Sequence, residues 1–481
     1  MPRGLVKAFN EIRGEGLVET VDGETIYINA ELFRGVGYQA LSVGTAVEFE
    51  IKRPASTPLA TDLRPVGARE FSPSPCPFNP QKATIDPRLF SGRSQQIRTT
   101  LTTLFDGGNA FLLGDRGVGK SSLALQLAAA VEGDRTLIDD LFPSGEEGPV
   151  RELTGESPFD HLVSFYSCYK NQRLADVVEG LGWGILSPDR NFSFKSKRSF
   201  EFGFDAKALK ALSKTETESK TPNDLTRALI EVVRGVYEEY AEFSGIVFFI
   251  DEANHINDTD GFGSFLRATS AMLESLGYSR VSFVVSGLSS SWKRMYREDK
   301  SITRFFDVVE VPTMTSDELG QIIDRAMAAS DKTINHDAKA AIVRRAERYP
   351  HPVHLLGYHA FQKDTDGVID LEDVQRAERY VIETLKRQEF TDIYDDLGNE
   401  LEFLIVDLLA SVSHARLSLE ELVRATGEPR DQVAGKLGSL MQSEVVTKAI
   451  SGRKAAYTIR DPLFRLYFRW TKSGWDNEVG A

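Results

Sequence analysis

A glycine-rich octapeptide ends in adjacent lysine and serine residues, a combination that can hold a polyphosphate. It matches the pattern GxxxxGK[ST], follows the apolar run 110–113 and precedes an alanine- and leucine-rich stretch typical of a helix. Its glycines let backbone N–H groups turn toward phosphates, Lys120 supplies a charge to the β and γ phosphates, and the Ser121 hydroxyl can coordinate Mg²⁺. An ordinary glycine-rich turn is the alternative, but the flanking strand and helix favour a nucleotide site. The predicted contacts are Gly114, Asp115, Arg116, Gly117, Val118, Gly119, Lys120, Ser121 and Ser122.

A second apolar run, 245–250, ends in two carboxylates, Asp251 and Glu252. We expect Asp251 to hold the magnesium ion through its water shell and Glu252 to orient and deprotonate an attacking water. A strand ending in Asp-Glu is by itself more often a solvated strand end. Its place about 130 residues after the phosphate-binding pattern favours a functional pair.

The elements that must position these residues alternate between apolar strands and amphipathic helices from Phe90 to about Pro312. This alternation predicts a parallel sheet covered by helices on both faces. The predicted strands are Ala110–Leu113, His161–Phe165, Ile246–Ile250 and Val281–Val285. Between them, alternating phenylalanines over Asn191–Phe204 predict an inserted β-hairpin.

Short strands separated by glycines precede this region, and their number predicts a small barrel. The predicted strands are Leu5–Phe9, Gly16–Thr20, Thr25–Asn29 and Ala46–Ile51. A proline-rich stretch then predicts an extended linker, because proline lacks an N–H donor and disfavours helix at the preceding residue.

Helical spacing dominates after Pro312, and the chain ends with three helices and a hairpin, the order of a winged helix–turn–helix. The predicted helices are Ser316–Ala329, Ala338–Arg348, Val353–Phe361, Leu371–Lys386, Leu401–Ser411, Leu419–Ala425 and Arg430–Gln442; the hairpin arms are Val445–Lys448 and Ala455–Ile459. The predicted domains are an all-β OB-type barrel (1–67), the linker (68–88), an α/β P-loop NTPase core (89–312), a helical lid (313–395), a winged helix (396–471) and a tail (472–481).

Composition limits the function further. The 481 residues carry a formal net charge of −14, which argues against a wholly basic nucleic-acid coat. The two cysteines, Cys76 and Cys168, are far apart, so neither a disulfide scaffold nor a cysteine-rich zinc site is expected. The apolar run 246–250 is too short to span a bilayer, and Glu11 interrupts the N-terminal segment where an export signal would be apolar. We expect a cytoplasmic protein.

Several segments resemble those of AAA+ and STAND-type ATPases. Phe90-Ser91-Gly92-Arg93 is similar to the F-x-G-R element that lies by the adenine in that family, which implies nucleotide contacts for Gly92 and Arg93. The strand 281–287 and the residues after it resemble the sensor-1 segment, so Ser286 or Ser289 would lie near the γ-phosphate.

Three later segments extend the resemblance, which covers about residues 85–470. Arg304, in Thr303-Arg304-Phe305-Phe306, is either an arginine finger toward a neighbouring subunit or a salt-bridged surface residue. The stretch 349–357 resembles the start of the sensor-2 helix in the archaeal-type, origin-recognition-like branch, with His354 or His351 where an arginine is usual. The spacing of these histidines and His359 does not favour a metal site. The stretch 457–470 resembles the Y-x-I-x-D-P-L-x-R-x-Y ending of these ATPases.

Residues 3–67 resemble a cold-shock domain, a family that stacks bases of single strands on surface aromatics between basic residues. Three aromatic positions of the family are replaced here by Ala8, Glu15 and Leu17, and a histidine is replaced by Asn29. Each base stack contributes about 1–3 kcal/mol, so we expect weak nucleic-acid binding or a protein-docking role. The residues left for a nucleic acid are Lys7, Phe9, Arg13 and Tyr27.

The hairpin near the C-terminus is basic, with Lys448, Arg453, Lys454 and Arg460. This composition predicts either a wing that contacts DNA phosphates or a module that packs on the ATPase.

The combined prediction is an ATP-binding, Mg²⁺-dependent ATPase whose nucleotide state controls assembly or engagement of nucleic acid. The catalytic residues would be Glu252, Lys120 and Arg304. The alternatives are a nucleotide-dependent scaffold or signalling switch with little hydrolysis, recruiting a protein through the barrel, and a nucleic-acid chaperone. Expected partners are DNA or RNA, a protein, and further copies of the chain in an ATP-dependent homo-oligomer, with no membrane.

Overall fold

A computed structural model describes most of the chain. It describes residues 3–10, 15–20, 24–29, 46–52, 59–65, 76–142, 159–186, 221–239, 243–257, 259–385, 390, 397–411, 416–451 and 454–472. The chain divides into two compact units, Met1–Cys76 and Pro77–Ala481. The hairpin predicted at Asn191–Phe204 lies outside the described residues.

The first unit contains a closed barrel with strand order β1-β2-β3-β5-β4. Its strands are β1 (Arg3–Asn10), β2 (Glu15–Thr20), β3 (Thr25–Asn29), β4 (Ala46–Lys52) and β5 (Leu59–Pro65). Alternation places Val18, Ile26, Val47 and Phe49 in its interior, fully buried. The four predicted strands are confirmed, and β5 is an additional strand without a prediction of its own.

The second unit is built around a five-stranded parallel sheet with the order β10-β6-β9-β8-β7. The strands are β6 (Asn109–Leu113), β7 (His161–Ser167), β8 (Gly245–Asp251), β9 (Val281–Gly287) and β10 (Phe306–Glu310). The parallel sheet predicted from the sequence is therefore confirmed. Since β9 lies between β6 and β8, its carboxyl end is placed between the phosphate-binding pattern and the paired carboxylates.

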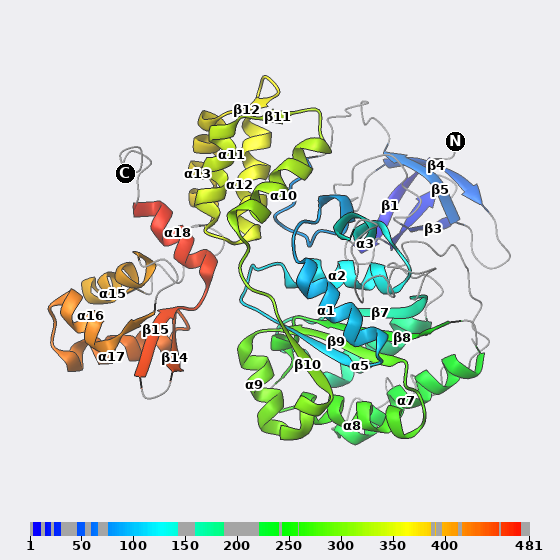
Figure 1. The fold of residues 1–481 in the computed structure, drawn as a ribbon. Coiled ribbons are helices and arrows are strands. Elements are labelled where there is room, and N and C mark those ends of the chain that lie inside the picture. Colours follow the sequence, from blue (N-terminus) through cyan, green and yellow to red (C-terminus); the bar gives the residue numbers. More distant parts are fainter. Residues whose placement is uncertain are drawn as a thin grey trace. The chain divides into compact units, whose positions relative to one another are not determined.

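Helices cover both faces of this sheet (Figure 1). They are α1 (Ser94–Phe105), α2 (Lys120–Val131), α3 (Thr136–Leu141), α5 (Leu174–Leu186), α7 (Pro222–Glu239), α8 (Phe262–Ser275) and α9 (Ser289–Glu298). Short 3₁₀ helices are η2 (Pro87–Leu89), η3 (Ala253–His255) and η4 (Lys300–Arg304).

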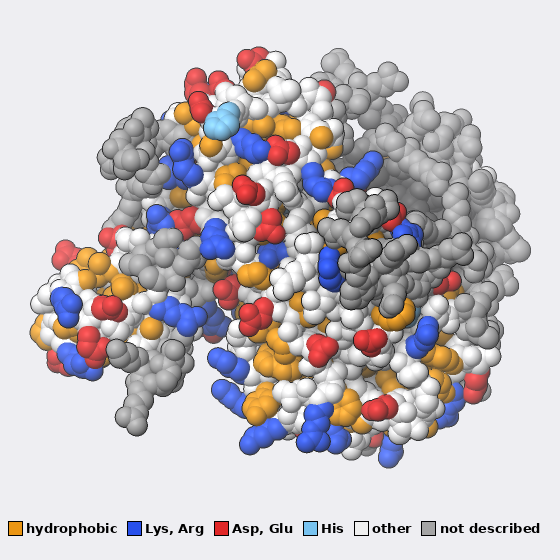
Figure 2. Space-filling view, viewed as in Figure 1, with side chains coloured by type: hydrophobic (Ala, Val, Ile, Leu, Met, Phe, Trp, Pro, Cys, Tyr) orange, Lys and Arg blue, Asp and Glu red, His pale blue; other side chains and the backbone are white. Residues whose placement is uncertain are grey.

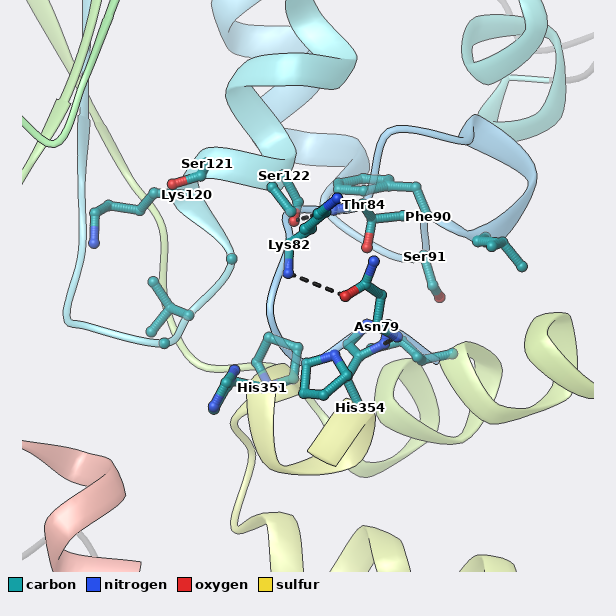
Figure 3. Close-up of a pocket in the computed structure, with 18 of the residues that line it drawn as sticks. Asn79, Lys82, Thr84, Phe90, Ser91, Lys120, Ser121, Ser122, His351 and His354 are labelled. Atoms are coloured by element: carbon teal, nitrogen blue, oxygen red, sulfur yellow. Dashed lines mark hydrogen bonds between the residues drawn. The ribbon is translucent and has the colours of Figure 1, made fainter. Parts of the chain in front are cut away.

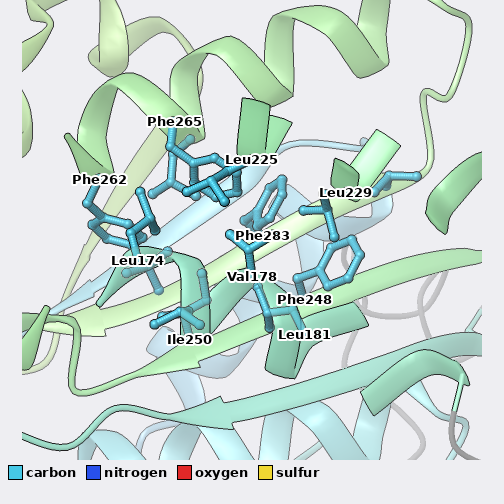
Figure 4. Close-up of a cluster of buried hydrophobic side chains, with 14 of the residues drawn as sticks. Leu174, Val178, Leu181, Leu225, Leu229, Phe248, Ile250, Phe262, Phe265 and Phe283 are labelled. Atoms are coloured by element: carbon cyan, nitrogen blue, oxygen red, sulfur yellow. The ribbon is translucent and has the colours of Figure 1, made fainter. Parts of the chain in front are cut away.

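Alternate residues of the strands supply two cores, which is why these strands are apolar throughout. Phe248 and Ile250 of β8 pack with Phe283 of β9 against α5, α7 and α8 (Figure 4). The rings of Phe248 and Phe283 stack at 5.2 Å between centroids. On the other face Phe249 stacks on Phe165 of β7 at 5.7 Å. This double core holds the strand ends in fixed positions.

The remaining elements are helical apart from short strands. After the sheet come α10 (Ser316–Ala328), β11 (Thr333–Ile334), α11 (His336–Ala346), α12 (Pro350–Lys363), β12 (Val368–Ile369) and α13 (Leu371–Leu385). Then follow α15 (Glu400–Ser411), β13 (Leu417–Ser418), α16 (Leu419–Thr426), α17 (Arg430–Gln442), β14 (Val446–Ser451), β15 (Lys454–Ile459) and α18 (Pro462–Lys472). The predicted helices are confirmed to within a few residues.

Capping residues explain several of these boundaries. Thr315 is the N-cap of α10 and Ser418 that of α16, each in a reciprocal capping box with the glutamate three residues later. Gly427, with φ 73°, ends α16 in the left-handed conformation that glycine adopts without strain. Among the described residues, no helix is both long enough and apolar enough to cross a membrane.

Candidate nucleotide-binding site

The glycine-rich loop joins the buried strand β6 to the first turn of α2. Gly117 and Gly119 have φ values of 78° and 91°, a region that residues with a side chain avoid. At Gly114 an added Cβ would lie 2.6 Å from the Val311 carbonyl oxygen. Glycine is thus required for the loop to turn closely over the end of the sheet, where its N–H groups and the N-terminus of α2 form an anion site.

Lys120 is the buried cation of this loop, with 3 % of its surface exposed. Its Nζ donates a hydrogen bond of 2.8 Å to the Asp115 carbonyl oxygen. Burial lowers the pKa of Lys120, while the negative charges of Glu252 and Asp251 act in the opposite direction. A phosphate group in the loop would add a compensating anion beside this desolvated ammonium group.

Three side chains from three elements meet at the end of β8. Ser286, at the end of β9, donates a short hydrogen bond from Oγ to Oδ1 of Asp251, and the Ser121 hydroxyl donates to the same carboxylate. Ser286 Oγ also accepts from the backbone N–H of Glu252 at 3.1 Å. Burial raises the pKa of Asp251, and the two serine hydrogen bonds oppose this shift. The predicted pair Ser121 and Asp251 is therefore brought together.

Glu252 follows in a strained left-handed conformation, φ 55°, that turns the chain away from the strand. Its Oε2 accepts a hydrogen bond of 3.1 Å from Nδ2 of Asn254. Arg294 of α9 holds the η3 turn by donating to the carbonyl oxygens of Ala253 and Ile256, both at 3.0 Å. The Glu252 side chain borders the same pocket as the glycine-rich loop.

The donor atoms near Asp251 suit a hard cation such as Mg²⁺. The Ser121 hydroxyl interacts with the Asp251 carboxylate, and both groups are oxygen ligands of the kind Mg²⁺ prefers. Two protein ligands are enough where phosphate oxygens and water complete the octahedron. In the described part of the chain, no group of three or more His, Cys, Asp or Glu residues is placed to bind a metal ion by itself.

A segment of the predicted linker forms one wall of the pocket, and we call Pro77–Thr84 the strap. Figure 3 shows Asn79, Lys82 and Thr84 between the start of α2 and the two histidines of α12. The Thr84 N–H donates to Ser122 Oγ at 3.0 Å, so this predicted nucleotide contact also holds the strap. The buried Gln126 side chain donates to the carbonyl oxygens of Thr84 and Ile85 at 2.9 and 2.8 Å.

The strap was predicted as part of an extended linker because Pro77 and Pro80 disfavour regular secondary structure. The available signal was a single aromatic, Phe78, between Pro77 and Pro80. Its ring is 1 % exposed and packs edge-on against His354, with 6.3 Å between ring centroids. Gly357 of α12 leaves room for the ring, since an added Cβ there would lie 2.7 Å from it.

Arg93 borders the pocket but uses its guanidinium group for backbone contacts. It donates to the carbonyl oxygens of Pro312 and Val118 at 2.6 and 2.7 Å. These bonds tie the phosphate loop to the chain that leaves β10. Gly92 precedes it with φ 70°, and an added Cβ would meet Glu318 Oε1 at 2.7 Å. Arg93 is thus placed to position the loop.

The first turn of α12 lies against the glycine-rich loop. An added Cβ at Gly117 would lie 3.8 Å from His351, and one at Gly119 would lie 3.6 Å from Pro350. The Nδ1 atom of His354 accepts from the Asn79 N–H at 3.4 Å. Burial lowers the pKa of His354 to about 4, so its imidazole is neutral at pH 7. His354 can hydrogen-bond a ligand there but brings no positive charge.

Two arginines of the prediction lie on the surface. Arg116, in the glycine-rich loop, forms an ion pair of 3.1 Å with Asp461, which precedes α18. This pair joins the loop to the C-terminal elements. Arg304 is exposed at the end of η4 and does not border the pocket of its own chain.

The predicted nucleic-acid residues are only partly described. Lys7 and Phe9 lie in β1 and Tyr27 lies in β3, but the side chains of these three residues are not among those described. Arg13 and Arg453 lie outside the described residues altogether. Leu17, at an aromatic position of the cold-shock pattern, is 39 % exposed. On the C-terminal hairpin, Lys454 pairs with Ser451 through the backbone. Lys448 is exposed and places its ammonium group 5.9 Å from the Tyr457 ring, whereas Arg460 pairs with Glu444 at 2.7 Å.

Comparison with known proteins identifies the first unit. The cold shock protein CspB of Geobacillus stearothermophilus is 33 % identical over 63 residues, which cover 96 % of that protein and 13 % of this chain. The probable cold shock protein A of Mycobacterium tuberculosis is 35 % identical over 65 residues, covering 97 % of it and 13 % of this chain. Through this segment the chain belongs to the cold-shock protein family. The aligned length fits the cold-shock barrel formed by β1 to β5.

Most of the chain is similar in fold to a solved ATPase. The Walker-type ATPase of Pyrococcus abyssi superposes with a TM-score of 0.51 at 14 % identity, covering 81 % of this chain and 99 % of the other. At this identity the similarity shows a shared fold, in agreement with the resemblance to P-loop ATPases drawn from the motifs. No protein-family model matches the chain.

Proposed function

We propose that the chain is an ATP-binding, Mg²⁺-dependent ATPase of the AAA+/STAND-like type. One observation carries the proposal: the glycine-rich loop, Lys120, Ser121, Asp251 and Glu252 converge at the carboxyl edge of one parallel sheet. Buried charges without a ligand are unfavourable, so this grouping is best explained by a charged substrate that completes it.

Each side chain then has a distinct task. The loop N–H groups and Lys120 bind the triphosphate, and Ser121 and Asp251 hold the magnesium ion. When bound, the ion neutralises charge on the phosphate oxygens. Glu252 accepts the proton of the attacking water. Ser286 hydrogen-bonds both the Asp251 carboxylate and the Glu252 N–H and so fixes their relative positions. Arg304 is proposed to contribute from a neighbouring copy.

The other elements are proposed to couple this site to partners. We assign residues 89–312 to the ATPase core, 313–395 to a lid and 396–471 to a winged helix, on the element order α15, α16, α17, β14 and β15. The cold-shock barrel and the winged helix would engage DNA, RNA or a protein in a nucleotide-dependent way. Stimulation of ATP turnover by single- or double-stranded DNA is the direct measurement.

Substitution Lys120→Ala tests the nucleotide site. It removes the buried ammonium group, so we expect loss of ATP binding in calorimetry. The exposed Lys170→Ala is the matched control and should bind normally. Unchanged binding in Lys120→Ala would refute the assignment of the site.

Substitution Glu252→Gln tests the chemistry. The amide keeps the shape and the contact with Asn254 but cannot accept the proton, so we expect ATP binding without turnover, a loss of about 10²–10⁴-fold. Glu310→Gln, on the exposed surface of β10, is the control. Wild-type turnover in Glu252→Gln would remove Glu252 as the base.

The second candidate function, a nucleotide-dependent switch with little hydrolysis, is favoured by the Asn254–Glu252 hydrogen bond. It engages one oxygen, Oε2, of the carboxylate that would have to contact water. In that case Asn254→Ala raises turnover, and wild-type protein changes its assembly on binding ATP without consuming it. A low turnover that Asn254→Ala leaves unchanged would argue against this explanation.

A further inference from the structure

One exposed face of the ATPase unit is basic although the chain as a whole is acidic. Lys293, Tyr296 and Arg297 of α9, followed by Lys300 at the start of η4, are exposed. Lys293, Tyr296 and Arg297 are separated by three and four residues, which places them on one side of the helix, and Lys300 follows in η4. Figure 2 shows Lys and Arg side chains gathered at this edge of the molecule. We call these four residues the α9 basic face.

The opposite side of α9 is fixed to the core, so the basic face is presented on a rigid element. Met295 is fully buried, and Trp292 packs on Phe111 of β6 with 5.2 Å between ring centroids. Glu298, at the end of α9, accepts the Gly263 N–H at 2.6 Å and thereby caps α8. These contacts leave α9 little freedom to rotate.

Within the described part of the chain, the cations of the face, Lys293, Arg297 and Lys300, have no ion-pair partner. The adjacent Asp299 accepts from the Ser301 N–H at 2.8 Å and lies 3.5 Å from Arg267. Nearby carboxylates therefore serve other contacts.

Helix stability does not explain this arrangement. Like charges at positions i and i+4, here Lys293 and Arg297, are mutually unfavourable. The helix dipole favours cations in the last turn, where Arg297 lies, but not near the N-terminal half, where Lys293 lies. A partner that brings negative charge would account for the whole set.

We propose that the α9 basic face binds the phosphate backbone of single-stranded nucleic acid. Four helical residues advance about 6 Å, so Lys293 and Arg297 are spaced comparably with one or two charges of a nucleic-acid strand, which lie about 3.4 Å apart along the axis of a duplex. Tyr296, 43 % exposed among these cations, offers a ring on which a base can stack. This aromatic favours an unpaired strand over an acidic protein surface. These residues belong neither to the barrel strands nor to the C-terminal hairpin.

Salt-dependent binding of a labelled oligo(dT) strand to the full-length protein tests the proposal. The variant replaces Lys293, Arg297 and Lys300 with alanine together. Three lost phosphate contacts should reduce the slope of log affinity against log salt by about 2, and should weaken binding roughly 10–100-fold at about 0.1 M salt. Tyr296→Ala should weaken binding roughly 5-fold or more, and Tyr296→Phe should retain it.

A matched control removes the same total charge elsewhere. Arg227, Arg344 and Arg379 are exposed on α7, α11 and α13, and replacing these three with alanine should leave the slope unchanged. An equal effect of both triple variants would mean that only net charge matters, which overturns the proposal. Unchanged binding in the α9 variant overturns it as well. So would a loss of ATP-dependent self-association without a loss of strand affinity, because the face would then bind a second copy.

Discussion

Removing the Phe78 ring tests whether the strap is a working part of the nucleotide site. The ring is buried against Gly357 of α12. The strap and the residue after it are also held by hydrogen bonds from Gln126 to the Thr84 and Ile85 carbonyl oxygens, from the Thr84 N–H to Ser122 and from the Asn79 N–H to His354. Phe78→Ala deletes the apolar anchor and leaves these hydrogen bonds in place.

The magnitude follows from these contacts. Truncating a buried phenylalanine costs about 3–5 kcal/mol. The four remaining hydrogen bonds contribute about 0.5–1.5 kcal/mol each, while ordering the backbone opposes docking by about 1–2 kcal/mol per residue. Without its ring the strap should therefore be detached most of the time. Because ATP then binds only the docked fraction, we expect an apparent affinity weaker by at least roughly tenfold.

Two measurements on the full chain follow the change. Calorimetry with a non-hydrolysable ATP analogue gives the affinity, and trypsin cleavage after Lys82 reports detachment of the strap. We expect faster cleavage in Phe78→Ala and protection by the analogue in wild type. Phe105→Ala removes the same ring at a site that is 46 % exposed and should change neither.

Normal affinity combined with faster cleavage at Lys82 would refute the reasoning, since the strap would then be detached without consequence for the nucleotide. If Phe78→Ala only lowered the melting temperature and kept normal ATP affinity, the Phe78 ring would stabilise the fold without a role in nucleotide binding.

Two further predictions concern the interior of the second unit. Glu347 is shared by Arg465 and Arg469 of α18, so Glu347→Gln should lower the free energy of unfolding by about 3 kcal/mol in denaturant titrations; a change within experimental error would contradict this. Burial lowers the pKa of His354 from 6.5 to about 4, so the unfolded state binds a proton first as pH falls, and stability should decrease by about 3 kcal/mol between pH 6.5 and 4. His354→Gln should reduce this loss of stability between pH 6.5 and 4, whereas substitution of the exposed His336 by Gln should not. Equal pH dependence of stability in both variants would exclude His354 as the cause of the loss.

Local pattern was enough to predict the main elements and the two halves of the site. The glycine-rich loop Gly114–Ser121 and the apolar strand before Asp251 are short segments that can be recognised from neighbouring residues: glycines at positive φ in the first, and continuous burial in the second. The same is true of the barrel strands, where alternation places Val18 and Val47 inside. These features can be predicted from the sequence because each depends on only a few consecutive residues.

The remaining features of the site depend on contacts between segments that are distant in the sequence, and only the tertiary structure shows them. The strand order places β9 between β6 and β8, and only that order brings Ser286 to Asp251. Phe78 is far in the sequence from Gly357, and Arg116 from Asp461, yet each pair is in contact. Composition alone described the strap as a linker, because the free energy that orders it comes from α2 and α12 and not from its own residues.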